Sequence, residues 1–425
     1  MAMARICREK SPLVDMRLPL TAGFSSELWY GMDYVSFGRQ EAVLFLLDIG
    51  YSSQEFRPRN QEMKQNVIAL IFGGRSSERS VSLKSAATIH AALMALGKEV
   101  HCIGIDEQGV WRYLGRSHLF PENWEPSAPI VSLRPGCCSI FLSSRGAMDE
   151  INIDILFPAL HGRWGEDGTI QGLAAMCGIP CVGSGVLGSA ASMDKDITKR
   201  LLQSCGIRVA PWVSMRSMHP WDRLVECLGS TTLFIKPANS GSSIGISRVT
   251  DAAGYAEAYA LAVQHDRKVL AEAEIVGREI ECGLLERSDG LFVSSLGEII
   301  KNEGQAYYDY EAKYDCSCGA ELRVPALLPL AIAARIQECS KQAFECLDLK
   351  GLARVDFFLT DEGEVILNEV NTLPGFTSAS MYPRMLEYSG HPMSQLVEVL
   401  LSNARLPAGG GGSTTGLAGG VSQGM

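Results

Sequence analysis

Apolar runs alternate with segments of helical spacing through the middle of the chain, and this alternation predicts an α/β fold. Residues 67–72 form a continuous apolar run that ends in two glycines, which is typical of a buried strand that meets a turn. The segment 80–96 follows with apolar residues at helical spacing. A second apolar run at 155–160 precedes a helical segment at 173–177 and a short strand signal at 179–182. This β-α-β order favours an open α/β first domain.

Further along, the pattern predicts more strands and helices, whereas both ends of the chain lose the alternation. Strand signals at 233–236 and 268–272 and an amphipathic helix at 331–347 extend the folded body. The ends have no sustained period, so we do not expect them to bury a core, and we expect Met63 to be the functional start. The predicted parts are a poorly ordered N-terminal extension at 1–62, an α/β domain at 63–184, a central domain at 185–275, a C-terminal domain at 276–405 and a Gly-rich disordered tail at 406–425.

Composition fits a folded protein and narrows its setting. Hydrophobic residues make up 46% and charged residues 20% of the 425 residues, a balance typical of globular proteins. The net charge of −10 disfavours a general nucleic-acid binder. No apolar run approaches the ~18–20 residues that cross a bilayer, and the start has no signal-peptide layout. Since 13 scattered cysteines fit a reducing compartment, we expect a cytoplasmic protein without membrane or nucleic-acid partners.

Three glycines raise the possibility of a dinucleotide-binding fold. Gly183, Gly185 and Gly188 form a Gly-Xaa-Gly-Xaa-Xaa-Gly string between a short strand and a helix. That fold also needs an acidic residue about 20 positions further on to bind the ribose. No Asp or Glu occurs from Ile197 to Trp221. We therefore interpret these glycines as a turn between domains.

The segment from Leu233 to Gly245 contains an apolar strand, Lys236 and then a Gly/Ser-rich loop. Such a loop can close over a triphosphate with its backbone N–H groups while the lysine supplies positive charge. An ordinary Gly/Ser turn is the alternative, and the lysine stands before the glycines, unlike in a Walker loop. Lys195, which opens a predicted helix, is a candidate second phosphate cation or simply a solvated surface lysine.

Two strand-like runs late in the chain flank an acidic turn and predict a β-hairpin. If Glu362 and Gly363 form a two-residue turn, Asp356 lies directly opposite Glu369, and Asn371 shares their face. Facing like charges destabilise a sheet unless a cation lies between them, and oxygen ligands select Mg²⁺ or Mn²⁺. The alternative is a solvated hairpin face, which the apolar neighbours disfavour.

Two further segments are rich in reactive side chains. Residues 161–168 follow a buried strand, which is where α/β proteins place ligands, although turn chemistry explains part of their composition. Residues 307–314 combine aromatic and charged side chains before a loop and indicate only that something polar is bound there.

Together these segments resemble the D-alanine–D-alanine ligases of the ATP-grasp superfamily over about residues 64–404. Residues 73–82 look like the family's first glycine loop, 161–172 match its most specific signature, and 368–378 match its C-terminal one. The resemblance implies a three-domain ATP-grasp ligase, with an open α/β N-terminal domain and two α+β domains that clamp ATP. It implies that ATP converts one D-alanine into an acyl phosphate, which a second D-alanine attacks. It further implies Mg²⁺ or Mn²⁺, as two ions, a homodimer and a cytoplasmic role in peptidoglycan precursor synthesis.

Carried over position by position, the resemblance also implies which residues bind the nucleotide and the metal. The implied phosphate contacts are Lys195, Lys236 and Lys313, the adenine contacts are Glu272, Ala273 and Ile275, the ribose contact is Glu279, the closing loop holds Ser242, and the metal ligands are Asp356, Glu369 and Asn371.

The remaining implied residues hold the two amino acids and the developing oxyanion. They are Glu78 with His161 for the first ammonium, Arg354 and the Gly375 N–H for the oxyanion, Ser380 for the second carboxylate, and Ser242 and Tyr314 for a hydrogen-bonded link to Glu78. A tyrosine in this loop resembles the dipeptide-forming members, so we expect D-alanine as the second substrate.

Three alternatives stay open at this point. Close relatives of the family join D-alanine to D-lactate or D-serine and share most of these motifs. Another ATP-grasp carboxylate–amine ligase would use the same nucleotide chemistry, although it would not need the 161–172 signature. A non-catalytic ATP-binding protein is the third alternative, and the retained Lys236, Arg354, Asp356, Glu369 and Asn371 speak against it.

Overall fold

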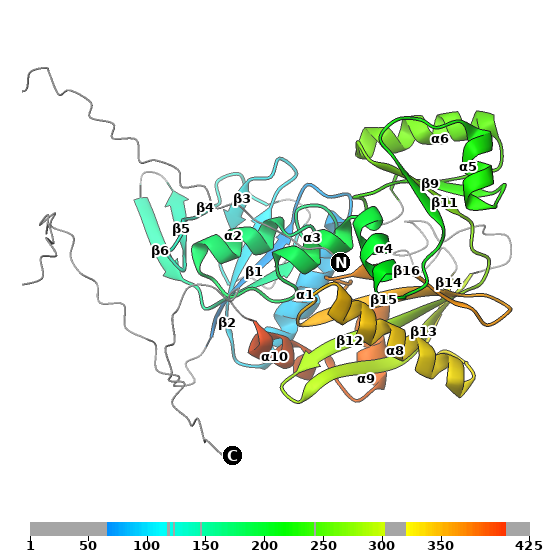
Figure 1. Ribbon diagram of the computed structural model, residues 1–425. Coiled ribbons are helices and arrows are strands. Elements are labelled where there is room, and N and C mark those ends of the chain that lie inside the picture. The colour runs from blue at the N-terminus through cyan, green and yellow to red at the C-terminus, as the bar shows by residue number, and fades with distance from the viewer. Residues whose placement is uncertain are drawn as a thin grey trace, which may run out of the picture. The chain divides into compact units, whose positions relative to one another are not determined.

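The computed structural model describes residues 66–116, 120–121, 124–144, 147–241, 244–301 and 320–404 (Figure 1). All of them belong to one compact unit, Gln61–Met425. The expected N-terminal extension, the start at Met63 and the C-terminal tail lie outside the described residues. Across the described ranges, none of the helices has both the length and the apolar character that a membrane span requires.

A parallel core of three strands and two helices begins the described chain. These elements are β1 (Val67–Gly73), α1 (Arg79–Ala95), β2 (Glu99–Ile105), β7 (Ile155–Ala159) and α2 (Thr169–Cys177). β1 pairs in parallel with both β2 and β7, because all three are nearly continuous apolar runs that are buried on both faces. α1 packs on this core through Ala86, Ile89 and Leu93. The predicted strands at 67–72 and 155–160 and the predicted helix at 80–96 are confirmed to within one residue at each end, and the segment 173–177 lies within α2, whereas β2 was not predicted. The predicted strand at 179–182 is wrong, because only Cys181 forms an isolated bridge there, to Leu156.

An antiparallel ribbon, which the apolar pattern did not predict, extends this sheet. Its strands are β3 (Trp111–Tyr113), β4 (Ile130–Leu133), β5 (Ser139–Ser144) and β6 (Ala147–Asn152). They complete the strand order β6-β5-β4-β3-β2-β1-β7. These strands are short and β6 is exposed over most of its length, so they lack the continuous apolar run that marks a buried strand.

A second sheet follows two connecting helices and is antiparallel, with the order β10-β9-β11-β8. Its helices α5 and α6 lie together on one side of the sheet (Figure 1). Tyr255 of α6 packs there on Leu233 and Ile235. The bounds are α3 (Val186–Met193), α4 (Lys195–Ser204), β8 (Trp212–Met215), α5 (Trp221–Leu228), β9 (Leu233–Pro237), β10 (Ser247–Val249), α6 (Ala252–His265) and β11 (Val269–Ala273).

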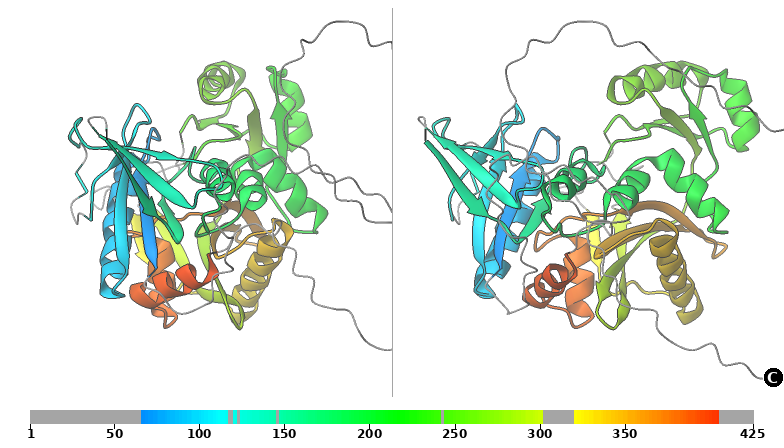
Figure 2. Two further views of the ribbon diagram at one scale, coloured as in Figure 1. Left: turned by 90° about the vertical axis from the view of Figure 1, so that its left-hand side faces the viewer. Right: turned by 60° about the vertical axis from the view of Figure 1, so that its left-hand side comes forward.

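The third sheet is antiparallel and has the order β14-β13-β12-β15-β16. Its elements are β12 (Arg278–Arg287), β13 (Gly290–Lys301), β14 (Ala320–Arg323), α8 (Leu330–Cys346), β15 (Leu352–Leu359), β16 (Val365–Asn371), α9 (Met381–Tyr388) and α10 (Met393–Asn403). Alternate residues of β12 face different helices: Ile280 and Cys282 share a core with α8, whereas Leu285 shares one with α9. α10 packs against α1, although the two helices stand at opposite ends of the described chain (Figure 2).

β15 and β16 form the predicted hairpin, with a correction to its turn. Asp356 pairs with Glu369 as predicted. Nearer the loop, each residue pairs one position away from the predicted register, since Leu359 pairs with Val365. β15 ends at Leu359 and β16 begins at Val365, so the predicted two-residue turn at 362–363 is wrong. A bulge directly after Asp356 adds the missing residue and restores the register at the site.

The glycines of the Gly-Xaa-Gly-Xaa-Xaa-Gly string allow close backbone packing. A Cβ on Gly351 would lie 3.3 Å from the Cα of Gly183, and a Cβ on Gly188 would lie 2.9 Å from the carbonyl oxygen of Asp348. The string therefore lets the chain approach the segment that leads into β15. Its interpretation as a turn holds for Gly183 and Gly185, whereas Gly188 lies within α3.

Candidate active site

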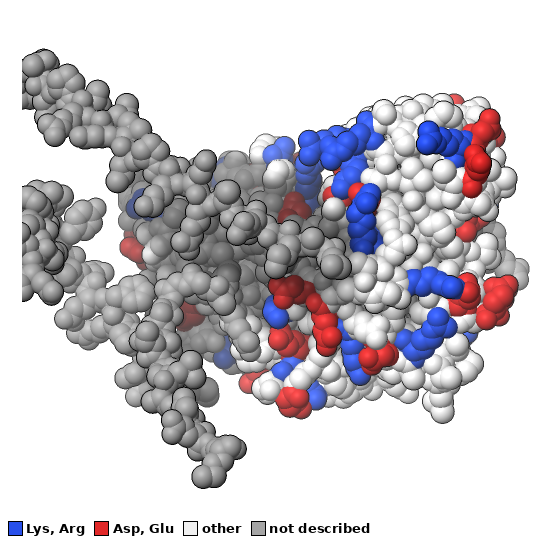
Figure 3. Space-filling model, viewed as in Figure 1, with Lys and Arg blue, Asp and Glu red and all other residues white. Residues whose placement is uncertain are grey.

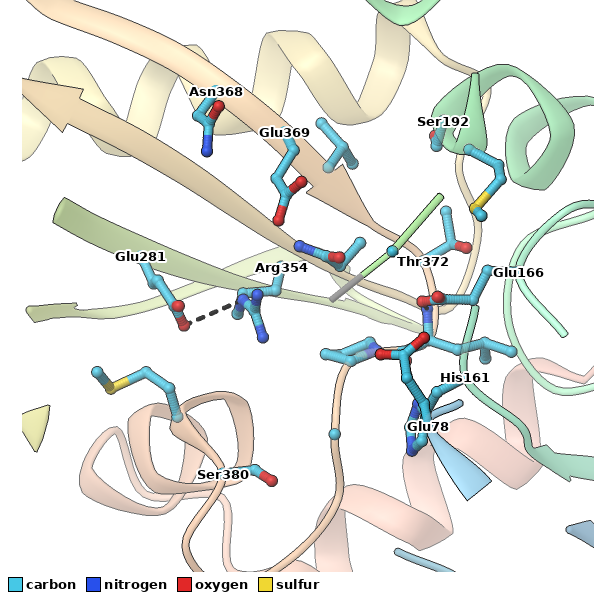
Figure 4. Close-up of a pocket in the computed structure, with 18 of the residues that line it drawn as sticks. Glu78, His161, Glu166, Ser192, Glu281, Arg354, Asn368, Glu369, Thr372 and Ser380 are labelled. Carbon is cyan, nitrogen blue, oxygen red and sulfur yellow. Dashed lines mark hydrogen bonds and ion pairs between the residues drawn. The ribbon is translucent and has the colours of Figure 1, made fainter. Parts of the chain in front are cut away.

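A cavity of about 110 Å³ lies where segments from all three sheets converge (Figure 4). Side chains that are far apart in the sequence meet on its wall, so only the tertiary fold assembles this site. The sequence-predicted residues that line it are Glu78, His161, Lys195, Arg354, Glu369, Asn371, Gly375 and Ser380.

Glu78 presents a buried carboxylate to this cavity from the residue before α1, where it is 6% exposed. Its Oε2 lies against Gly162, where a Cβ would collide with it, and a Cβ on Gly241 would lie 3.1 Å from the same atom. Gly162 also has a φ of 69°, so both its conformation and its contact with Glu78 require glycine. A buried carboxylate that faces a cavity is suited to bind an ammonium group.

His161 connects the loop after β7 to the loop after β16. Its Nδ1 lies 3.0 Å from the carbonyl oxygen of Leu373, and its Nε2 lies 3.0 Å from Ser85 Oγ. Ser85 Oγ in turn accepts a hydrogen bond from the Phe376 N–H at 3.1 Å. Burial lowers the pKa of His161, although the charge of Glu78 opposes this shift. Since a carbonyl only accepts, the neutral ring carries its proton on Nδ1, and the Ser85 hydroxyl donates to Nε2.

Glu166 is a site residue that the sequence reasoning missed. Its Oε2 accepts from the Gly162 N–H at 2.7 Å and its Oε1 from the Leu373 N–H at 3.3 Å. Burial and then the charge of Glu78 raise the pKa of Glu166 to about 8. The segment 161–168 was singled out for its reactive side chains, but nothing in the sequence placed Glu166 beside Glu78.

Two lysines share one buried glutamate at the second sheet. Lys236 Nζ of β9 lies 2.6 Å from Glu272 Oε2 of β11, and Lys199 Nζ of α4 lies 3.2 Å from Glu272 Oε1. Burial alone would raise the pKa of Glu272, but Lys199 and Lys236 outweigh it and lower that pKa. Burial lowers the pKa of Lys199 to about 8 against the opposing effect of Glu272. The two lysines carry one positive charge more than Glu272 neutralises, and this excess charge suits the binding of a phosphate.

Lys195 adds a further cation at the start of α4. Its Nζ donates to the carbonyl oxygen of Ser240 at 2.6 Å and lies 4.0 Å from Glu369 Oε2. It therefore stands between the Gly/Ser-rich loop and the acidic hairpin. A group of Lys and Arg side chains lies over α4 and the neighbouring part of the second sheet on the face shown in Figure 3.

Arg354 lies between two carboxylates on the third sheet. It forms a two-pronged hydrogen bond with Asp356, with both distances at 2.7 Å, and its Nε lies 3.0 Å from Glu281 Oε2 (Figure 4). Asn371 Nδ2 donates to Asp356 Oδ2 at 3.0 Å. Burial opposes the charged form of Arg354, but Asp356 and Glu281 outweigh it and raise its pKa well above the ordinary value. Glu281 is a second residue that the sequence reasoning missed, although it shares a strand face with Glu279.

The residues expected to bind metal offer an incomplete set of oxygen ligands. Asp356 faces Glu369 across the hairpin, and the amide of Asn371 lies on the same face. In the described part of the chain, no three Asp, Glu, His or Cys side chains gather closely enough to hold a metal ion. Mg²⁺ normally keeps water and phosphate oxygens among its ligands, so two carboxylates and an amide fit an ion that also binds a nucleotide.

Ser380 lies at the N-terminal end of α9, opposite the loop that carries Gly375. Its hydroxyl accepts from the Thr377 N–H at 3.1 Å, and a Cβ on Gly375 would lie 2.8 Å from Ser380 Oγ. The N-terminal end of a helix attracts carboxylates because its free N–H groups point outward.

The other predicted residues are distributed as follows. Glu279 lines an adjoining cavity of about 40 Å³ with Glu281, Asp356 and Glu369. Ala273 ends β11 and Ile275 lies in the link to β12, and neither lines the main cavity. Ser242, Lys313 and Tyr314 lie outside the described residues.

Comparisons with known proteins identify the family that the chain resembles. The family models described as D-ala D-ala ligase N-terminus and C-terminus match residues 67–184 and 201–402. A D-alanine–D-alanine ligase A of Pseudomonas putida is 67% identical over 340 residues, which are 80% of this chain and 97% of the relative.

Solved structures are similar over the same part of the chain. D-alanyl-alanine synthetase A of Vibrio cholerae has a TM-score of 0.71 and 32% identity over 81% of this chain and 99% of its own. The VanG D-Ala:D-Ser ligase of Enterococcus faecalis has a TM-score of 0.71 and 34% identity over 80% of this chain and 100% of its own. The predicted fold class is confirmed by these structures.

Proposed function

The chain belongs to the D-alanine–D-alanine ligase family, and we propose that it joins two D-alanines into D-alanyl-D-alanine while ATP is hydrolysed to ADP and phosphate. It is an ATP-dependent ligase whose product supplies peptidoglycan synthesis. One observation carries the proposal: a single cavity brings the carboxylate of Glu78, the cations Lys195 and Arg354, and the hydroxyl of Ser380 together. These groups match the charges of two amino acids and a phosphate.

The first step activates a carboxylate, which is a poor electrophile until it is phosphorylated. Transfer of a phosphoryl group depends mainly on positioning and on neutralisation of charge. Lys195 and Lys236 bind phosphates in this proposal, and Lys313 joins them from outside the described residues. The excess positive charge around Glu272 supports this assignment. Glu272, Ala273 and Ile275 bind the adenine and Glu279 the ribose.

The acidic hairpin is the proposed metal site. Asp356, Glu369 and Asn371 would hold Mg²⁺ or Mn²⁺, two ions in all, and the metal would supply charge neutralisation at the phosphates. Arg354 donates one hydrogen bond to each carboxylate oxygen of Asp356. Asp356 would therefore have to share these oxygens between Arg354 and a metal.

The second step places an amine against the activated carboxyl group. Glu78 binds the first ammonium, and Ser380 binds the second carboxylate at the start of α9. Arg354 and the Gly375 N–H stabilise the tetrahedral oxyanion, for which donors have to be in place beforehand. His161 holds the loop of Leu373 in position, since both of its ring nitrogens are engaged there and at Ser85. Ser242 and Tyr314 are proposed to complete the link to Glu78.

The domain boundaries, the assembly and the compartment are part of the same proposal. Boundaries near residues 185 and 276 are supported by the three sheets, whose strands follow one another along the chain without mixing. A cytoplasmic location is supported by the described cysteines, which are all free. The homodimer rests on the family resemblance alone.

Release of phosphate from MgATP is the direct test of the activity. D-alanine should stimulate it strongly, and D-alanyl-D-alanine should appear in equal amount. Release that needs a different amine acceptor would indicate another carboxylate–amine ligase. No release under any condition would indicate a non-catalytic ATP-binding protein.

The choice of second substrate needs a competition experiment. The 67% identity to a D-alanine–D-alanine ligase favours D-alanine over D-serine or D-lactate. With all three present at pH 7.5, D-alanyl-D-alanine should be the main product, and Tyr314→Phe should shift the preference towards D-lactate. A wild-type enzyme that makes mainly the ester or the D-serine product would overturn this choice and leave the ATP chemistry in place.

A further inference from the structure

A second cavity of about 260 Å³ opens at the carboxyl ends of β1, β2 and β7. This edge of a parallel sheet is where α/β proteins commonly bind ligands. The proposed ligase reaction assigns no role to its distinctive side chains. They are Arg75, Gln108, Trp111, Arg163, Trp164 and Leu173. We call this space the sheet-edge cavity.

The cavity has an excess of positive charge. Arg75 and Arg163 are exposed and form no ion pair with any of the described residues. The neighbouring acids are already occupied: Asp106 accepts from the Gln108 and Val110 N–H groups and lies 3.5 Å from Arg112 Nε.

Asp167 is occupied in the same way. It accepts from the Trp164 N–H at 2.9 Å and from the Thr169 N–H at 3.1 Å. Glu107 borders a separate surface hollow, which Arg75 also lines. Arg75 and Arg163 therefore line the cavity as two guanidinium groups without an ion pair among the described residues.

Much of the remaining cavity wall is apolar, and it includes an aromatic residue with a strained backbone conformation. Leu160, Ile170 and Leu173 line it together with Trp111. Trp164 has a φ of 75°, which is rare for a bulky residue, and the residue is 46% exposed. The Arg163 guanidinium lies 5.3 Å from the centre of its ring. Strain of this kind persists where the surroundings fix it, and it often marks a binding site.

We propose that the sheet-edge cavity binds a small carboxylate that has an aromatic or aliphatic body. The arginines bind the carboxylate, and the body packs between Trp111, Trp164 and Leu173. The site is distinct from the ligase cavity but shares the loop 161–168 with it, because Arg163 and Trp164 line one cavity, Glu166 lines the other and His161 lines both. A bound carboxylate would therefore act on the loop that positions Glu166 and His161.

Calorimetric titration of the full chain with 4-phenylbutyrate tests the proposal. The wild type should bind this probe, and the neutral 4-phenylbutanamide should bind about tenfold more weakly, because it lacks the charge that the arginines recognise. Arg163→Gln should weaken binding of the acid by a similar factor. The matched control Arg216→Gln, at another exposed arginine, should leave it unchanged.

Two further variants locate the bound probe. Leu173→Trp should fill the cavity and abolish binding, and if it fails to fold, the double variant Arg75→Gln/Arg163→Gln takes its place. Ser380→Ala, in the ligase cavity, should bind the probe as the wild type does. The proposal is overturned if the wild type does not bind the probe, if the acid and the amide bind equally, if the filled variant binds normally, or if Ser380→Ala loses binding.

Discussion

The two charge clusters near the ligase cavity combine cationic and acidic side chains in opposite proportion. On the second sheet, Lys199 and Lys236 share the single carboxylate of Glu272. On the third sheet, Arg354 contacts both Glu281 and Asp356. Glu369 faces Asp356 across the hairpin and lies 4.0 Å from Lys195. Counted over these side chains, two cations stand against one carboxylate in the first cluster, whereas Arg354 and Lys195 stand against three carboxylates in the second.

This difference separates binding from structural roles. A buried ion pair whose charges balance is complete, and it adds little to stability. A buried cluster with a surplus charge is costly until a ligand of opposite sign arrives, and such clusters gather at functional sites. The surplus on the second sheet suits phosphate, and the surplus on the third suits a divalent cation. The following variants test whether the second sheet binds phosphate and the third sheet binds the metal, in order of expected effect.

Loss of one hairpin carboxylate should have the largest effect. Glu369→Gln and Asp356→Asn should each reduce metal-dependent ligation on the order of 10³-fold, because several kcal/mol of charge stabilisation would be lost. Glu364→Gln, on the exposed loop of the same hairpin, is the matched control. The measurement is the steady-state ligation rate as a function of Mn²⁺ concentration. A variant with the same metal dependence as the wild type would show that the substituted residue is not a metal ligand.

The same two variants should differ in stability without metal. Glu369→Gln removes the charge that faces Asp356, so its melting temperature should hold or rise. Asp356→Asn deprives Arg354 of its two-pronged partner and should melt several degrees lower.

Lys236→Gln should come next in size and affect the nucleotide alone. The KM for ATP should rise about 10- to 100-fold, with the KM for D-alanine little changed, because the lysine contributes charge-assisted hydrogen bonds to a phosphate. Lys199 remains as a partner for Glu272, so the fold should survive. Lys341→Gln, in an exposed ion pair of α8, serves as the control. Equal changes in both KM values would argue against a phosphate contact.

Glu281→Gln should have a smaller and different effect. Arg354 keeps Asp356 but loses the second carboxylate that orients it, so kcat should fall about tenfold while the KM for ATP stays unchanged. Glu279→Gln is the matched control on the same strand face, and it should instead raise the KM for ATP. The positioning role of Glu281 is wrong if both variants change the same parameter.

Glu166→Gln should have the smallest effect, which appears in the pH dependence of stability. The pKa of Glu166 is 4.5 in the unfolded chain and rises to about 8 in the folded chain. Between pH 4.5 and pH 8 the folded state therefore keeps a proton on Glu166 that the unfolded state has lost. Its contribution to stability is therefore present below pH 4.5 and disappears as the pH rises through 8. The variant should lose this dependence and gain about 2–4 °C on the wild type between pH 5.5 and pH 8.5. Glu226→Gln on α5 should change nothing, and a wild-type melting temperature that rises over this range would contradict the raised pKa.

The sequence predicts the parts of the fold that carry a strong local pattern. The buried strands β1, β7 and β9 and the helices α1 and α8 have continuous apolar runs or clear helical spacing. The ribbon β3 to β6 has neither of these patterns, so it is recognised only from the strand pairing in the structure. The hairpin register was right at Asp356 because a bulge compensated for the wrong turn, and no local pattern encodes that bulge.

The same reasoning explains which site residues were found. Lys236, Asp356 and Glu369 stand next to recognisable motifs, and family motifs supplied Glu78, Arg354 and Ser380. Glu166, Glu281 and Lys199 were missed, because each acts through a partner that lies far away in the sequence. Burial and pairing of such residues are properties of the tertiary fold and have no periodic trace.

The hydrogen bonds of His161 have a consequence for how the protein is made. His161 and Leu373 are 212 residues apart, and Ser85 and Phe376 are 291 residues apart. A ribosome delivers the N-terminal segments first, so α1 waits for α10 and the loop after β7 waits for Leu373. The nascent chain therefore exposes the side of α1 that α10 later covers until α10 has been made. Its ligase cavity is complete only after the segment 368–381 has left the ribosome.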